Sequence, residues 1–187
     1  MFIDALCGDF FMIPLNYKDY TIKAKIVNPG SIESRLKEIC AKYIGMDIQT
    51  DHYFKIEKGK LKWRQGTIEN LITHYERISE SGIEKTIVYR YDLNPSDKAV
   101  KALKATYAEL AVIRKERKIY RVDNIKVHLD KLSDGKQFIE IEAIDSEERF
   151  SHDELKAQCK TMKLKLGIED EDLVATGYMT GQNMGGQ

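Results

Sequence analysis

The chain has 187 residues, of which 42 % are hydrophobic and 32 % are charged, and it is long enough for one globular domain with a sizeable core. Thirty Lys and Arg residues balance thirty Asp and Glu residues, so the overall charge does not indicate a nucleic-acid or anionic-membrane partner. No stretch is long enough to span a bilayer, and the N-terminal segment lacks the basic start of a signal peptide. We therefore expect a cytoplasmic protein that binds neither nucleic acid nor membranes.

The cysteines give no sign of a metal site. Cys7, Cys40 and Cys159 are odd in number, and their spacing fits no metal-binding pattern. Cys40 and Cys159 fall on apolar helical stripes, which predicts buried, reduced thiols. Free thiols of this kind are typical of a reducing compartment.

The first regular element is a strand over 20–27, in which apolar and polar residues alternate. Residues 1–19 show no clear period, and we interpret them as an N-terminal extension. After an Asn-Pro-Gly turn, a helix is expected to begin at Ser31. The apolar stripe of this helix consists of Ile32, Leu36, Ile39 and Tyr43.

Alternating segments then follow one another closely. Four strands are predicted over 48–56, 61–65, 69–78 and 85–93, the first two joined as a hairpin. A helix opens at Ser96, and its inward stripe consists of Val100, Leu103, Tyr107 and Leu110.

Three more strands are expected over 111–121, 123–131 and 136–144. The last helix spans 151–166, with a capping box of Ser151 and Glu154 and a stop at Gly167. No repeat or linker interrupts the pattern, so we expect one domain over 20–179 and a flexible, Gly-rich tail over 180–187.

About eight strands and three helices, with the strands clustered in sequence, predict an α+β fold with antiparallel pairing. Eight alternating strands are enough to close a barrel and remove the sheet edges. Each strand has one apolar and one charged face, as where Lys62 and Arg64 alternate with Leu61 and Trp63. In a closed or nearly closed barrel with helices outside, the charged faces point into the lumen. The alternative is an open sheet with helices on one side and water on the other.

The charges on these faces are unevenly distributed. The early strands and residues 115–117 carry mainly cations, whereas acids concentrate at Asp130, Glu140 and Glu142. Lys and Arg neutralise phosphate oxygens, and carboxylates hold Mg²⁺ or Mn²⁺. Separate cationic and acidic walls are what a complex of a metal with a polyphosphate requires.

The segment VIRKERKIYRVDNIKVHLDKLSDGKQFIEIE resembles the second half of CYTH domains, the family of class IV adenylyl cyclases and thiamine triphosphatases, also called triphosphate tunnel metalloenzymes. Upstream, DHYFKIEKGKLKWRQG and LITHYER are similar to other family segments, and LGIEDEDLVATGYM resembles the family's closing segment with its Tyr178. The resemblance covers about residues 20–179. It implies a tunnel-like antiparallel barrel that binds triphosphates together with a divalent metal.

The resemblance also implies the site. The phosphate-binding cations are expected to be Lys23, Lys25, Lys62, Arg64, Arg77, Lys85, Lys115, Arg117 and Lys126. The family carries Glu-x-Glu-x-Lys on its first strand, where this chain is read as Thr21-Ile22-Lys23-Ala24-Lys25. The metal, Mg²⁺ or Mn²⁺, would then rest on Asp130, Glu140 and Glu142.

For several residues the sequence allows both a functional and a purely structural role. Any one of the cations could be a solvated surface residue, and Glu140 and Glu142 could simply balance neighbouring cations. His128 could orient an acid or shuttle a proton, or it could make a structural hydrogen bond. Tyr75 and Tyr120 could line a base pocket or only pack. No P-loop, nucleophile elbow or His-Glu-x-x-His motif is present.

The leading hypothesis is an enzyme that binds and hydrolyses a triphosphate-containing small molecule, such as ATP, thiamine triphosphate or inorganic triphosphate, with a divalent metal. One alternative is a class IV-type adenylyl cyclase, which converts ATP to cyclic AMP and pyrophosphate. The other is a non-catalytic nucleotide- or polyphosphate-binding protein, because the acidic motif of the first strand is degenerate. Whether two copies form a homodimer is left open.

Overall fold

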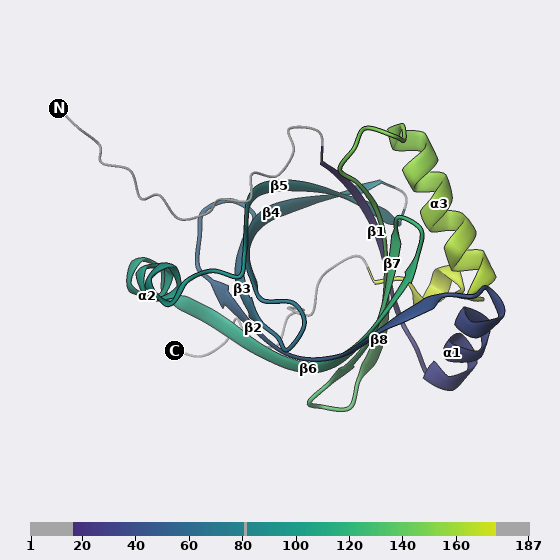
Figure 1. Cartoon of the computed structure of the whole chain (residues 1–187), viewed down its shortest axis with the longest axis horizontal. Helices are drawn as coiled ribbons and strands as arrows, with labels where there is room; N and C mark the ends of the chain where they lie inside the picture. Colours follow the sequence, from purple (N-terminus) through teal and green to yellow (C-terminus); the bar gives the residue numbers. More distant parts are fainter. Residues whose placement is uncertain (1–16, 81, 175–187) are drawn as a thin grey trace.

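The structure is a computed structural model that describes residues 17–80 and 82–174, in which eight strands close into one antiparallel barrel (Figure 1). The order around the barrel is β1-β5-β4-β3-β2-β6-β7-β8. The strands are β1 (Lys18–Lys25), β2 (Lys42–Phe54), β3 (Lys60–Gln65), β4 (Leu71–Glu80), β5 (Ile83–Leu93), β6 (Glu109–Val122), β7 (Ile125–Leu132) and β8 (Gln137–Asp145). The predicted α+β barrel is therefore confirmed, and the open sheet is excluded.

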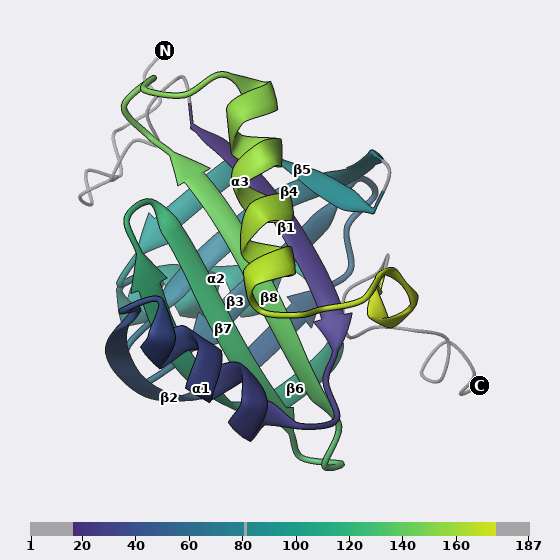
Figure 2. The same cartoon turned by 90° about the vertical axis from the view of Figure 1, so that its right-hand side faces the viewer.

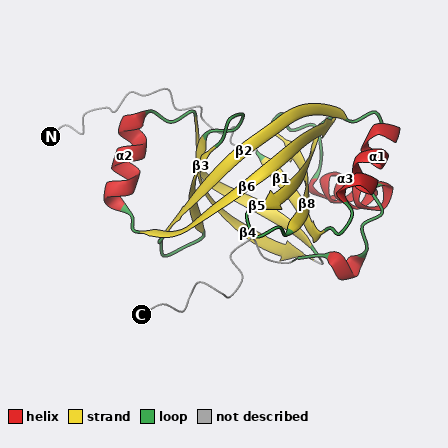
Figure 3. Cartoon of the chain, turned by 90° about the horizontal axis from the view of Figure 1, so that it is seen from below, coloured by secondary structure: helices red, strands yellow, loops and turns green. Residues whose placement is uncertain are grey.

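Three helices lie outside the barrel: α1 (Pro29–Glu38), α2 (Asp97–Thr106) and α3 (His152–Lys165). Figure 2 shows α1 and α3 over the face formed by β1, β7 and β8. Seen from below, α2 lies at the opposite side of the barrel from α1 and α3 (Figure 3). A short 3₁₀ helix, η1 (Asp170–Asp172), follows α3.

The larger core fills the space between the barrel and helices α1 and α3. Ile22, Ile139 and Ile141 point outward into this core and are at most 2 % exposed. On the other side Trp63 packs with Leu103 of α2. All four barrel residues face helices as the alternation predicted, so the apolar face of these strands is the outer one.

The outer helices are held by local caps and by contacts with the barrel. The predicted capping box of α3 is present, with reciprocal hydrogen bonds between Ser151 and Glu154. Cys159 of α3 is buried, and its thiol donates to the carbonyl oxygen of Tyr20 at 3.2 Å. The expectation of a buried thiol is correct for Cys159.

The end of the first helix differs from the prediction. Helix α1 ends at Glu38, Cys40 has a positive φ of 55°, and its side chain is exposed. Tyr43 already belongs to β2, which is longer than expected because it pairs with β6 along almost its whole length. The buried Cys40 and the helical Tyr43 were therefore wrong predictions, because ladder pairing outweighs the local apolar period.

Two further boundaries also differ. Helix α2 ends at Thr106, and Tyr107 and Leu110 are 37 % and 45 % exposed, so neither continues its inward stripe. Strand β1 begins at Lys18, two residues inside the expected N-terminal extension. Cys7, Tyr178 and the expected tail lie outside the described residues. Within the part of the chain that is described, no helix has the length and apolar character needed to cross a membrane.

Candidate functional site

The charged faces of the strands point into the barrel, where they surround a cavity of about 110 Å³. Seven of the nine predicted phosphate-binding cations line this cavity. They are Lys23, Lys62, Arg64, Arg77, Lys115, Arg117 and Lys126. Small barrels are normally filled by side chains, and here many of the filling side chains are charged.

The other two cations lie elsewhere. Lys85 pairs across the strands with Tyr20, a residue of the outer core, so Lys85 is on the outer face of the barrel. Lys25 is exposed at the end of β1, opposite Phe138. Neither lines the cavity, and the structure corrects the expectation that they would.

The Arg64 guanidinium sits between two carboxylates. Its Nε donates to Asp51 Oδ1 at 2.8 Å, and its Nη1 donates to Glu69 Oε2 at 2.8 Å. Lys115 Nζ also donates to Asp51, at 3.0 Å. Burial opposes the charge of Asp51, but Arg64 and Lys115 hold the pKa of this carboxyl well below its usual range.

The predicted metal ligand Asp130 is engaged by Arg117. Arg117 Nε and Nη2 both donate to the Asp130 carboxylate at 2.6 Å, and Lys115 lies 3.6 Å from it. Burial raises the pKa of Asp130, but the charge of Arg117 outweighs it and lowers the pKa below the usual range. Asp130 therefore serves as the partner of a bidentate arginine and is not one of the group of ligand atoms described below.

The Glu140 carboxylate binds two arginines that come from different strands, β4 and β6. Its Oε1 accepts from Arg77 Nη2 and its Oε2 accepts from Arg117 Nη2, both at 2.9 Å. Arg77 also donates to Glu84 at 3.3 Å, but its buried Nε has no acceptor among the described residues. The cationic and acidic side chains thus alternate around the lumen, and the predicted separation into two walls is wrong.

Two lumenal lysines are unusually easy to deprotonate. Burial lowers the pKa of Lys62 to about 7, and the nearby charge of Arg64 adds to this effect. Burial likewise lowers the pKa of Lys23 to about 7, although the charge of Glu140 opposes the shift. The Lys62 ammonium lies 5.6 Å from the centre of the Tyr75 ring. Near neutral pH, both lysines therefore gain charge readily when an anion approaches.

The first strand brings an acid into the lumen that the sequence analysis placed outside the domain. Asp19 lines the cavity, and Thr21 Oγ1 donates to Asp19 Oδ1 at 3.2 Å. Asp19, Thr21 and Lys23 have the spacing of Glu-x-Glu-x-Lys, so a reading of the motif that begins at Asp19 also fits the sequence. Burial and then the charge of Glu142 raise the pKa of Asp19 to about 7.

The loop before β4 contributes a further acid, Glu69, which the sequence analysis did not single out. Asp47 is fully buried and accepts from the backbone amides of Ile68 and Glu69 at 2.8 and 3.0 Å. This holds the connection between β3 and β4 so that Glu69 reaches Arg64 and, at 3.2 Å, Lys126. Asp51 shares the parity of Tyr53, which faces the lumen. Glu69 shares the parity of Arg77 in the strand predicted over 69–78, so the alternation could have found it, although it precedes β4 in the structure.

The aromatic residues divide between the two faces. Tyr75, Tyr53 and Tyr91 line the cavity. Tyr120 belongs to the outer core, with its ring 5.0 Å from that of Tyr43. Of the two tyrosines considered for a base pocket, only Tyr75 therefore faces the lumen.

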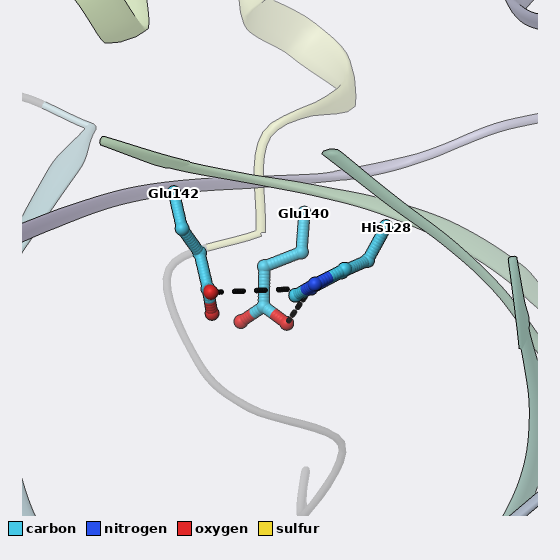
Figure 4. A group of neighbouring side chains, drawn as sticks. All are labelled: His128, Glu140 and Glu142. Atoms are coloured by element: carbon cyan, nitrogen blue, oxygen red, sulfur yellow. Dashed lines mark ion pairs between the residues drawn. The ribbon is translucent and has the colours of Figure 1, made fainter. Parts of the chain in front are cut away.

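One group of side chains converges on a point in the lumen. His128 of β7 and Glu140 and Glu142 of β8 offer ligand atoms that all lie within 4.8 Å of one another (Figure 4). His128 Nδ1 lies 3.8 Å from Glu140 Oε2 and 4.0 Å from Glu142 Oε2. The two acids were predicted as metal ligands from sequence, whereas His128 was not.

Fold and lumen together define a class of protein: a closed antiparallel barrel around a cavity where buried cations and carboxylates are interleaved. Comparison with protein families identifies this class. The family model for the CYTH domain matches residues 20–178, which is most of the chain. The chain therefore belongs to the CYTH family. No curated protein matches it significantly.

Solved structures confirm the fold. A protein from Pyrococcus horikoshii is 24 % identical, with a TM-score of 0.72 and 86 % of this chain and 96 % of that chain covered. A candidate adenylate cyclase from Vibrio parahaemolyticus is 14 % identical, with a TM-score of 0.67 and coverage of 86 % and 94 %. A candidate adenylyl cyclase from Hippeastrum, described as having a dominant triphosphatase activity, is 12 % identical, with a TM-score of 0.52 and coverage of 80 % and 88 %.

Proposed function

We propose that this chain binds the triphosphate group of a small molecule inside its barrel and hydrolyses it with the help of a divalent metal. The observation that carries the proposal is the buried cavity lined by seven cationic side chains. Burying so much charge is costly, and an anion with several charges would give it a use. Membership of the CYTH family and the activities described for the Vibrio and Hippeastrum proteins support the same substrate class.

The lumen offers donors for phosphate oxygens. Arg77 has a buried Nε without an acceptor among the described residues. Lys62 lies over the Tyr75 ring and forms no ion pair with a carboxylate of the described residues. A phosphate oxygen would satisfy both groups. Many of the lining side chains are buried, which strengthens electrostatic contacts in the lumen.

The acidic group in the lumen fits a divalent cation. Glu140 and Glu142 would hold it, and beside them lies the buried His128, whose nitrogens have no hydrogen-bond partner in the described part of the chain. When bound, such a cation neutralises charge on phosphate oxygens and polarises the reacting phosphoryl group. Because Glu140 would then share less of its charge with Arg77 and Arg117, their guanidinium groups would become better donors to phosphate. We therefore expect metal and triphosphate to bind cooperatively.

A second candidate function is binding without turnover. Thr21 supplies a hydroxyl where the family carries a second acid, and Arg64 and Arg117 are already paired with Asp51 and Asp130. A tunnel of this kind could retain a triphosphate without reacting with it. An adenylyl cyclase remains the third candidate, since the lumen does not favour attack at one particular phosphorus.

One assay separates these functions. Phosphate, pyrophosphate and cyclic AMP release is measured from ATP, thiamine triphosphate and inorganic triphosphate, with Mg²⁺ and with Mn²⁺. We expect metal-dependent phosphate release. Glu142→Gln should reduce it at least about tenfold, because an amide loses the charge that attracts a hard cation. The control is Glu33→Gln, which alters an ion pair with Lys118 on the outside of the barrel. Binding without any product release supports the second candidate.

A further inference from the structure

His128 is a buried side chain whose hydrogen-bonding capacity is unused. It is 1 % exposed, and within the described residues neither ring nitrogen has a hydrogen-bond partner. Leaving a buried polar group unpaired costs about 1–3 kcal/mol. The structural hydrogen bond considered from the sequence therefore does not form within residues 17–80 and 82–174, and the position of this imidazole calls for another explanation.

The strand pairing aims His128 at the two acids. His128 lies directly across from Glu140, and Lys126, two residues earlier, lies across from Glu142. The imidazole is thus next to both carboxylates on the lumenal face, as Figure 4 shows. Its Nδ1 is 3.8 and 4.0 Å from their nearest oxygens. Both distances are too long for a hydrogen bond.

Those separations suit a shared ion better than a direct contact. Nitrogen and oxygen ligands lie about 2.0–2.2 Å from a transition metal, so two ligands of one ion are about 3.0–3.5 Å apart. Small side-chain rotations that move each ligand atom by less than about 1 Å would bring the three ligand atoms to this spacing. We propose that His128, Glu140 and Glu142 form one metal site with a nitrogen donor, which selects a first-row transition ion such as Mn²⁺ over Mg²⁺.

The donor set is the reason for this selectivity. Mg²⁺ binds through oxygen ligands and demands near-ideal octahedral geometry. An imidazole nitrogen favours the transition ions, whose affinities rise along the series from Mn²⁺ through Co²⁺. Two carboxylates alone would leave the choice to ion availability. The role of the metal rests on the proposed function, whereas the position of the site rests on the convergence of the three side chains and its metal preference rests on His128.

The first experiment titrates the metals alone, without triphosphate, against the intact chain and follows thermal stability and metal affinity. Wild type should bind Mn²⁺ and Co²⁺ more tightly than Mg²⁺. His128→Asn should reduce the affinity for Mn²⁺ and Co²⁺ by about tenfold or more and that for Mg²⁺ much less. His74→Asn is the matched control, because His74 lies on the outer face and contacts the Lys58 carbonyl oxygen.

The second experiment uses the wild-type chain, so it does not require that a substituted variant folds. Pulsed electron paramagnetic resonance of Mn²⁺ bound to protein labelled with ¹⁵N-histidine should show one directly coordinated nitrogen. A spectrum without nitrogen coupling, or equal metal preference in wild type and His128→Asn, overturns the inference. If the chain binds triphosphate but the spectrum shows no nitrogen coupling, the proposed function is kept and the metal site with a nitrogen donor is rejected. Nitrogen coupling in a chain that binds no triphosphate keeps the metal site and removes the proposed function.

Discussion

At the scale of single residues, buried lysines connect the fold to its proposed ligand. Lys62 is buried, and its pKa falls to about 7 because burial and Arg64 disfavour the ammonium. Its surroundings come from three strands besides its own. The charged and titratable groups that face it are Asp51, Tyr53, Arg64, Tyr75, Lys115 and Arg117. An anion placed among them would restore the proton.

This predicts proton uptake on binding. A bound triphosphate raises the pKa of Lys62 above about 7, so affinity should be highest below this pH and should fall as the pH rises through it. Calorimetry at pH 8 in buffers of different ionisation enthalpy measures the uptake. Lys62→Met should take up fewer protons and bind more weakly, whereas Lys58→Met, at an exposed lysine, should match wild type. Equal uptake in both variants would contradict the assignment.

The effect of Lys62 on folding stability has the opposite pH dependence to its effect on binding. The folded pKa of about 7 lies below the ordinary value of 10.5, so between these pH values the unfolded chain holds a proton that the folded chain lacks. The contribution of Lys62 to stability therefore rises with pH across this window. Lys62→Met should fold at least as stably as wild type near pH 7, which makes it a clean probe of binding.

At the scale of elements, the loop between β3 and β4 places a carboxylate at the cations. Asp47 accepts a hydrogen bond from the loop backbone at Glu69. The Glu69 carboxylate in turn accepts hydrogen bonds from Arg64 and Lys126. Gly66 of the loop leaves no room for a side chain, since a Cβ there would lie 2.7 Å from Asp47 Oδ1. Glu69 is thus an anion built into the chain that contacts two of the cations proposed to bind phosphate.

Removing this internal anion should strengthen binding. Glu69→Gln keeps the shape of the side chain but releases the charge of Arg64 and Lys126, and triphosphate affinity should increase by roughly tenfold. Isothermal titration at two ionic strengths tests this, because the gain should shrink at high salt. Glu76→Gln, which alters a pair with Lys58 on the outer face, is the control. Weaker binding by Glu69→Gln would mean that Glu69 orients the cations and does not compete for them.

At the scale of the whole molecule, closure joins the first and last strands. Residues of β1 from Lys18 to Lys25 pair with β8 from Asp145 to Phe138, which completes the ring and its lumen. Helix α3 packs over this junction, and Leu155 is fully buried there. The strands that carry Asp19, Glu140 and Glu142 therefore depend on the packing of an outer helix.

Loss of this packing should be costly. Leu155→Ala should lower the free energy of unfolding by about 2–5 kcal/mol, because it leaves a cavity between α3 and the barrel. Leu164→Ala on the same helix, at a leucine that is 73 % exposed, should change it by less than about 0.5 kcal/mol. Chemical denaturation measures both values. Similar losses in the two variants would show that α3 does not stabilise the junction.

The sequence by itself determined which face of most strands is charged. Alternation has a period of two residues and is a local property, so the lumenal positions of Lys62, Arg64, Arg117, Glu140 and Glu142 could be predicted without a structure. The same reasoning found the capping box of α3. The resemblance to CYTH domains then supplied the expectation that these strands close into a tunnel-like barrel.

Only the tertiary structure decided which charge meets which. The partners of a lumenal side chain come from other strands and loops, so the pairing of Asp130 with Arg117 and of Glu69 with Lys126 had no local signal. The register of β1 against β5 sent Lys85 outward. The convergence of His128 on two glutamates likewise depends on the register of β7 against β8, because pairing across strands, and not sequence spacing, sets these distances.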